Sequence, residues 1–149
     1  MKPIKLLLVL IGSLAFAQSA QADWSTARRI TWTVGGSYTP AIAIDSSGYL
    51  HAVWHDYTPG NPEIYYKRSM DGGASWSASQ RISWTANGSY DSDVTVDSSG
   101  GVHVVWYDYT HGNHEICNRG STDGGNSFLL SQRLTWTPGE SHLPAIAMD

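Results

Sequence analysis

The residues of this sequence that could take part in chemistry include a histidine pair in a predicted loop. His111 and His114 form an H-x-x-H pair that is followed at once by a carboxylate, Glu115. Imidazole nitrogens and carboxylate oxygens are ligands that Zn²⁺ accepts. The sequence repeats itself, however, and the matching positions of the preceding copy hold Pro59 and Pro62, so the repeat does not require the histidines. We therefore expect no metal site, with His111 and His114 as weak candidates only, and no cofactor.

The carboxylates are the second group, since a pair of them is what most glycoside hydrolases use. Most recur in both copies of the repeat and would point in several directions rather than converge, namely Asp56 and Asp108, and Glu63 and Glu115. Asp91 and Asp93 occur once, where the preceding copy has Thr39 and Ala41. They lie at the inner end of a predicted strand. Because surface residues drift between repeats, we expect neither to be catalytic.

The repeat that contains these residues is marked by two copies of one short motif. Ser69 to Trp76 reads S-M-D-G-G-A-S-W, and Ser121 to Phe128 reads S-T-D-G-G-N-S-F, at an offset of 123 − 71 = 52 residues. A short carboxylate can accept hydrogen bonds from backbone N–H groups two or three residues on, and paired glycines permit positive φ. The motif therefore predicts a tight structural turn, built in the two copies by Ser69, Asp71, Gly73 and Trp76, and by Ser121, Asp123, Gly125 and Phe128.

The 52-residue offset extends over most of the chain. Each copy is predicted to contain four short strands separated by turns, and no segment after the N-terminus shows a sustained helical period. In the first copy the strands are expected at residues 40–45, 50–57, 63–69 and about 79–85. The second of these is apolar on both faces, as a strand between two neighbouring sheets should be. The sequence therefore predicts an all-β fold made of repeated four-stranded units.

The turn motif resembles the Asp box, the bacterial-neuraminidase repeat of the sialidase-like β-propeller superfamily. The resemblance implies two complete four-stranded blades, at about residues 40–84 and 92–136, and a partial third blade from residue 144. Trp24 to Thr33 matches only an outer strand, so a strand is expected at each end. Propellers typically have about four to eight blades. We therefore expect this sequence to be the front part of a longer protein, with a ring of several short chains as the alternative.

Active sialidases of this superfamily bind the substrate carboxylate with three arginines and use a tyrosine nucleophile. The first arginine usually lies in an aromatic-Arg-Ile-Pro motif, whereas Arg29 here lies in A-R-R-I-T and recurs as Arg81 and Arg133. Residues repeated in every blade cannot converge on one substrate. We therefore favour a non-catalytic module that binds a glycan or a protein, or serves as a scaffold. The alternative is the N-terminal part of an exo-sialidase-like glycoside hydrolase.

The N-terminal sequence predicts the cellular location, and the charge indicates which partners are not expected. Residues 1–22 have two lysines, an apolar core and an A-x-A cleavage site, which predicts a signal peptide and a mature domain at residues 23–149 in the periplasm or outside the cell. The apolar core is too short to span a membrane. The net charge is −4 without a basic cluster, so nucleic acid is not an expected partner. Open blade edges favour self-association.

Overall fold

The computed structural model describes residues 25–110 and 112–149, so the predicted signal peptide and His111 lie outside the described residues. The described chain is all-β, with two four-stranded antiparallel sheets and no helix. Among these residues there is accordingly no helix that could cross a membrane. The first sheet contains, in order, β1 (Ser37–Ile44), β2 (Leu50–Asp56), β3 (Glu63–Ser69) and β4 (Gln80–Arg81); the second contains β5 (Ser89–Val96), β6 (Val102–Asp108), β7 (Glu115–Ser121) and β8 (Gln132–Arg133).

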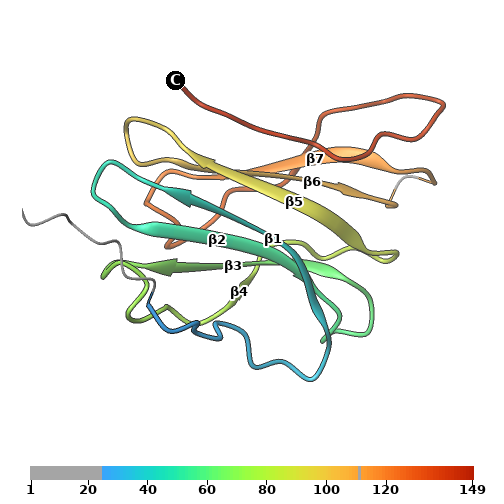
Figure 1. Cartoon of the computed structure of the whole chain (residues 1–149). Helices are drawn as coiled ribbons and strands as arrows, with labels where there is room; N and C mark the ends of the chain where they lie inside the picture. Colours follow the sequence, from blue (N-terminus) through green and yellow to red (C-terminus); the bar gives the residue numbers. More distant parts are fainter. Residues whose placement is uncertain (1–24, 111) are drawn as a thin grey trace, which may run out of the picture.

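The two sheets stack face to face, as successive blades of a propeller do (Figure 1). A single apolar core lies between them and draws on strands of both sheets. Its buried members are Val53, Ile64, Tyr66, Ile82, Val94, Val102, Val104, Trp106 and Cys117. Burial raises the pKa of the Cys117 thiol to about 12, so the thiol is a packing group. The predicted all-β fold of two complete four-stranded units is confirmed.

The middle strands follow the sequence prediction closely, but the outer ones differ. β1 begins at Ser37 rather than Pro40, because an irregularity in register at Thr39 (φ = +44°) lets three more residues join the sheet. The fourth strand pairs over Gln80–Arg81 only, not over 79–85. After Arg81 the Ile82 N–H still donates to the Ile64 carbonyl at 2.8 Å, but the Ile64 N–H donates to the Ser83 hydroxyl, also at 2.8 Å, and not to a backbone carbonyl. The fourth strand is therefore short by construction.

The segment before β1 lies against the first sheet in the place that the repeat predicts. The Lys67 ammonium donates to the carbonyl of Ile30 at 2.8 Å. One repeat later, the Arg119 guanidinium donates to the carbonyl of Ile82 at 2.7 Å. Residues 25–33 therefore cover the first sheet as residues 79–85 cover the second. They do not pair as a strand, contrary to the prediction. A fourth strand pairs with the third strand of its own blade, and the described residues before Ile30 include no such strand.

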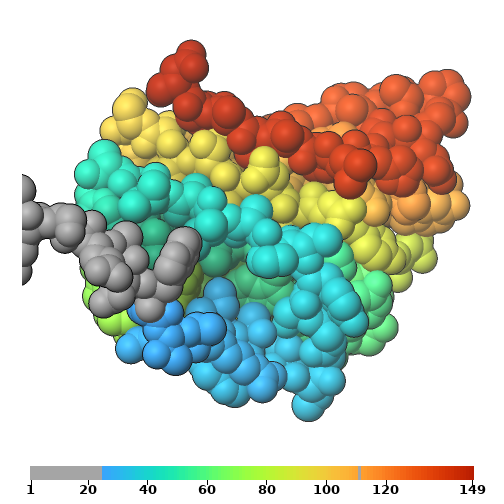
Figure 2. All heavy atoms as spheres, in the orientation of Figure 1, coloured from blue at the N-terminus to red at the C-terminus, as the bar shows by residue number. Residues whose placement is uncertain are grey.

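The C-terminal segment lies against the second sheet in the same way as β5 lies against the first sheet. The Ser141 N–H donates to the His114 carbonyl at 2.8 Å, just as the Ser89 N–H donates to that of Pro62 at 2.7 Å. Leu143 has φ = +51°, as its repeat equivalents also have positive values. Figure 2 shows this segment in red, lying along the yellow and orange residues of the second repeat. It is not paired as a strand with any described residue, contrary to the prediction.

Candidate functional site

The two Asp boxes are closed turns held by their own side chains. In the first, Asp71 accepts from the Ser69 hydroxyl at 2.8 Å and from the Ser75 N–H and hydroxyl at 2.8 and 2.6 Å. The Ser69 oxygen in turn accepts from the Gly73 N–H at 2.8 Å. The carboxylate reaches four residues on, not the predicted two or three, because two successive glycines with positive φ (Gly72 and Gly73) lengthen the turn.

The second box repeats these bonds between Ser121, Asp123, Gly125 and Ser127. Hydrogen bonds, first among them that of the serine hydroxyl four residues on, lower the pKa of Asp71 and of Asp123 to about 2. In both boxes the two carboxylate oxygens are used by the turn. These aspartates therefore have little capacity left for a ligand or for proton transfer.

The lowered pKa values predict acid lability. A carboxyl with a folded pKa of about 2 and an ordinary unfolded value stabilises the fold fully above pH about 4, and this contribution is lost as the pH falls through about 2. We expect the Asp71→Asn/Asp123→Asn variant to melt several degrees lower at neutral pH and to lose less stability on acidification. Thermal melts between pH 2 and 7 measure both effects. A parallel acid limb in the variant would show that other carboxyls carry the acid response.

The aromatic residue of each box contacts a neighbouring repeat. Phe128 meets Tyr66 of β3 edge-on, with ring centroids 5.0 Å apart, and thus joins the second box to the first sheet. Trp76 lies in a pocket with Arg28, Arg29 and Trp32 of the segment before β1. The aromatic side chain of the second box therefore holds one blade to the next.

The arginines form framework contacts and do not converge. Arg81 pairs with buried Glu63 at 2.8 Å, and Arg133 pairs with buried Glu115 at 2.7 Å. The remaining guanidinium groups bind backbone carbonyls: Arg28 binds Ala74, Arg29 binds Thr31, Arg68 binds Gly124 and Arg119 binds Ile82. Each described arginine thus contacts the protein framework, and Arg28 and Arg29 also share the pocket beside Trp76.

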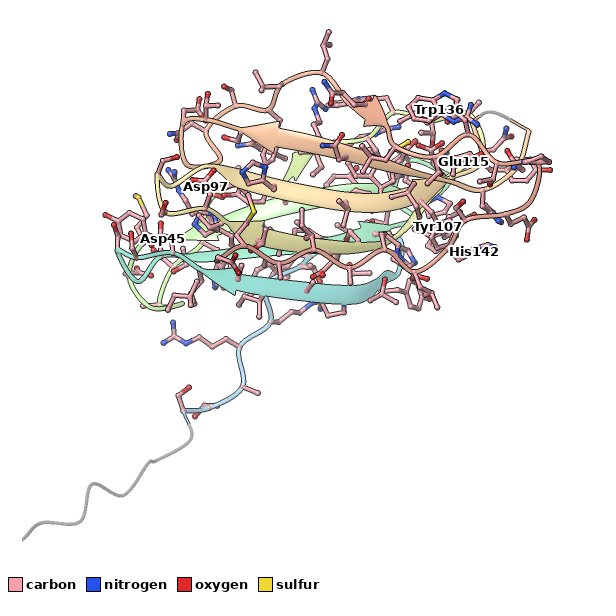
Figure 3. All side chains as sticks on the ribbon, turned by 90° about the horizontal axis from the view of Figure 1, so that it is seen from above. Asp45, Asp97, Tyr107, Glu115, Trp136 and His142 are labelled. Carbon is pink, nitrogen blue, oxygen red and sulfur yellow. The ribbon has the colours of Figure 1, made fainter. Side chains whose placement is uncertain are left out.

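A continuous row of tyrosine and histidine rings crosses both sheets at the end opposite the Asp boxes. We call it the aromatic ridge, and it consists of Tyr38, His55, Tyr57, Tyr90, Tyr107, Tyr109, His114 and His142. Neighbouring rings contact one another from blade to blade, with centroids 4.6–6.4 Å apart. In Figure 3, Tyr107 and His142 lie at this end of the sheets, and Asp45 and Asp97 lie at the other.

The ridge presents both apolar rings and polar atoms to solvent. Tyr38, Tyr57 and Tyr109 are 53%, 41% and 38% exposed. An open depression of about 480 Å³ lies at the first blade, lined by Gly36, Tyr38, Thr39, His55 and Tyr57. Here the Thr39 hydroxyl and the His55 Nδ1 share a hydrogen bond of 2.9 Å.

Of the two unique carboxylates, Asp91 joins the ridge and Asp93 does not. An Asp91 oxygen lies 4.0 Å from His55 Nδ1, between the two blades. Asp93 instead accepts from the N–H groups of Val94 and Ile146 at 2.9 and 3.0 Å. Asp93 is thus a link to the C-terminal segment, while Asp91 lies beside His55 in the ridge.

The imidazoles fall into structural and ridge groups. His51 shares a 2.8 Å hydrogen bond with the Tyr66 hydroxyl, and His103 shares one of 2.8 Å with Asp97, both at the far end of the sheets. His114 lies in the ridge beside Glu140 and His142. Sequence reasoning selected His114 but missed these two neighbours, because they come from the start of the third repeat. The signal was their absence from the earlier repeats, where Gly88 and Tyr90 stand.

Comparisons with known proteins bear on the architecture. No protein-family model and no curated protein matches the chain. Among solved structures it is similar to a Hadza microbial sialidase (17% identity, TM-score 0.47), covering 63% of this chain and 24% of the sialidase. It is also similar to a glycosyl hydrolase from Bacteroides ovatus (12% identity, TM-score 0.47), covering 68% and 32%. The chain thus spans about a third or less of these proteins.

Proposed function

We propose that this chain is an exported, non-catalytic propeller module that binds glycans at the aromatic ridge. The observation that carries the proposal is the ridge itself, a row of rings continuous over both blades with three tyrosines substantially exposed. Sugars present apolar C–H faces and polar hydroxyl edges. A tyrosine offers a matching apolar face together with a hydroxyl that can donate or accept a hydrogen bond.

The geometry of the ridge suits an extended ligand. The rings of Tyr38, His55 and Tyr90 follow one another with centroids 5.6 Å apart, so a ligand can contact both blades at once. The depression beside Tyr57 would take one sugar unit, with Thr39 and His55 as hydrogen-bonding partners. Burial lowers the pKa of His55, which favours a neutral imidazole that can both donate and accept.

Three features support binding over hydrolysis. The arginines contact the framework, and Arg81 and Arg133 are paired with the separate buried carboxylates Glu63 and Glu115. Burial raises the pKa of Tyr90 and of Tyr107, and a neighbouring carboxylate, Asp91, raises that of Tyr107 further. A tyrosine nucleophile needs the opposite shift, toward the phenolate. The fixed aspartates of the boxes are also occupied.

The test is a glycan microarray that carries neutral and sialylated oligosaccharides, followed by calorimetry with the strongest hit. We expect the whole chain to bind, and Tyr57→Ala and Tyr109→Ala each to weaken binding about 10-fold, as loss of one stacked ring costs about 1–3 kcal/mol where bases stack on aromatic residues. Trp136→Ala is the matched control, since that ring is 69% exposed but lies outside the ridge. It should bind like the parent chain.

Two results would overturn the proposal. Binding that is lost in Trp136→Ala but kept in both tyrosine variants would place the site on the outer strands. Turnover of a fluorogenic sialoside by the chain, abolished by one tyrosine or arginine substitution, would favour the hydrolase alternative. Circular dichroism of each variant separates loss of binding from loss of fold.

A further inference from the structure

Three side chains at the C-terminal end of the ridge have their ligand atoms gathered in one place. His114 precedes β7, and Glu140 and His142 belong to the segment that opens the third repeat. One nitrogen or oxygen of each lies within 4.8 Å of the others. His142 Nε2 is 3.1 Å from one Glu140 oxygen, and His114 Nδ1 is 3.6 Å from the other. We call these three residues the HEH cluster.

One atom of the HEH cluster lacks a partner. His114 Nδ1 is shielded from solvent and makes no hydrogen bond to the described residues, since 3.6 Å to Glu140 is too long. A shielded polar atom of this kind is uncommon in folded proteins and calls for an explanation. Its lone pair or proton faces the carboxylate across a gap that a bound ion would fill.

The architecture of the blade does not require the HEH cluster. At the equivalent junction of the first blade, Pro62 takes the place of His114, Gly88 that of Glu140 and Tyr90 that of His142. The backbone bond that holds the junction together is the same in both, from Ser89 to Pro62 and from Ser141 to His114. The first junction thus forms without any ligand-type side chain, so a structural role alone does not explain the two imidazoles and the carboxylate.

We propose that the HEH cluster binds one divalent cation of the Zn²⁺ class. Two imidazoles and one carboxylate form a known three-ligand set for zinc, with a further position open to water or another ligand. Bonds of about 2.1 Å in a tetrahedron hold ligand atoms about 3.4 Å apart. The separations of 3.1 and 3.6 Å are close to this value, and they run to different oxygens of Glu140, so the carboxylate presents one oxygen to each imidazole.

Aromatic neighbours would fix the imidazole orientations. Tyr107 meets His114 and His142 at centroid distances of 5.0 and 4.8 Å, and Tyr109 meets His114 at 5.1 Å. Ligands held by packing lose less rotamer freedom when they bind a metal. Mixed nitrogen and oxygen ligands of this kind also favour Zn²⁺, Ni²⁺ and Cu²⁺ over Ca²⁺ and Mg²⁺, which prefer oxygen alone. The proposal stands on ligand geometry and does not depend on glycan binding.

The test is calorimetric titration of the metal-stripped whole chain with Zn²⁺, and absorption spectroscopy with Co²⁺ in its place. We expect one ion per chain and visible Co²⁺ bands of low-symmetry coordination. His114→Ala and His142→Ala should each weaken Zn²⁺ binding by at least about 100-fold, beyond the roughly 10- to 100-fold cost of losing an outer partner. Glu140→Gln, at a 57% exposed side chain, removes the charge with little risk to the fold and should also weaken binding.

Two controls make the assignment specific. His103→Ala removes an imidazole that pairs with a carboxylate at the far end of the sheets, at 2.8 Å, and should leave Zn²⁺ binding unchanged. His111→Ala removes the other histidine of the H-x-x-H pair and should likewise bind zinc normally. Loss of binding in His111→Ala with retention in His142→Ala, or a folded parent chain that binds no Zn²⁺ at millimolar concentration, would overturn the proposal.

Discussion

Replacement of Glu63 by alanine is expected to lower the free energy of unfolding by about 3 kcal/mol, because it leaves several shielded donors without an acceptor. The Glu63 carboxylate is fully buried. It accepts from the Arg81 guanidinium and the Thr85 N–H at 2.8 Å each, and also from the Ser83 hydroxyl. One side chain at the start of β3 is thus hydrogen-bonded to three residues of the segment 81–85.

Denaturant unfolding of the parent chain and two variants measures this effect. Glu63→Gln keeps the shape and one acceptor oxygen, and Arg81 is 28% exposed and can be solvated, so this variant should lose less stability than Glu63→Ala. Glu140→Ala is the control for removal of an exposed glutamate. A loss below about 1 kcal/mol in Glu63→Ala would mean that water replaces the carboxylate, as at a surface ion pair.

The middle strands of each blade could be predicted from the sequence because their local and long-range signals agree. The strand Glu63–Ser69 has the predicted bounds, and the strand Leu50–Asp56 ends one residue before the predicted range of 50–57. Turn residues lie at the ends of both strands, and the strand at 50–56 is apolar on both faces. The outer strands were less predictable because their ends depend on tertiary contacts. The Ser83 hydroxyl accepts the Ile64 N–H that would otherwise extend the β4 ladder, and the irregularity at Thr39 extends β1.

The sequence alone does not predict the ridge, because repeated residues argue against a catalytic site. That inference holds for a catalytic centre, where unlike groups must converge on one atom. It does not hold for a surface, because stacked blades place equivalent side chains side by side. Tyr38 and Tyr90 occupy one position in successive blades, and His55 lies between them. Asp91 was selected as unique, but only the packing of the sheets shows its distance to His55.

The HEH cluster was beyond sequence reasoning for a different reason. Glu140 and His142 follow His114 by more than twenty residues, with no spacing pattern that marks a metal site. They meet because the C-terminal segment follows the path of β5, fixed by the backbone bond from Ser141 to His114. The 52-residue repeat contains this information, since Ser89 and Pro62 are the matching pair. It becomes usable only once the contact between blades is known.

The contact between blades itself is expected to fail in Gly125→Ala. Gly125 lies in the second Asp box with φ = +83°, and an added Cβ would overlap the Tyr66 hydroxyl. Tyr66 cannot move aside easily, since its ring is fully buried and its hydroxyl shares a 2.8 Å hydrogen bond with His51. Backbone strain and overpacking together should lower the free energy of unfolding by about 3–5 kcal/mol, as measured in denaturant.

Gly73→Ala is the matched control, because it has the same backbone strain without the neighbouring blade. Gly73 is the equivalent residue of the first box, with φ = +89°, and the nearest atom to an added Cβ is Leu50 Cδ1 at 3.5 Å, an ordinary contact. Gly73→Ala should lower the free energy of unfolding by about 1–2 kcal/mol, which is the cost of a left-handed backbone conformation alone. The difference between the two variants therefore measures the packing of one blade against the next. Equal losses would mean that Tyr66 yields, and that the contact between blades is softer than its burial and hydrogen bond imply.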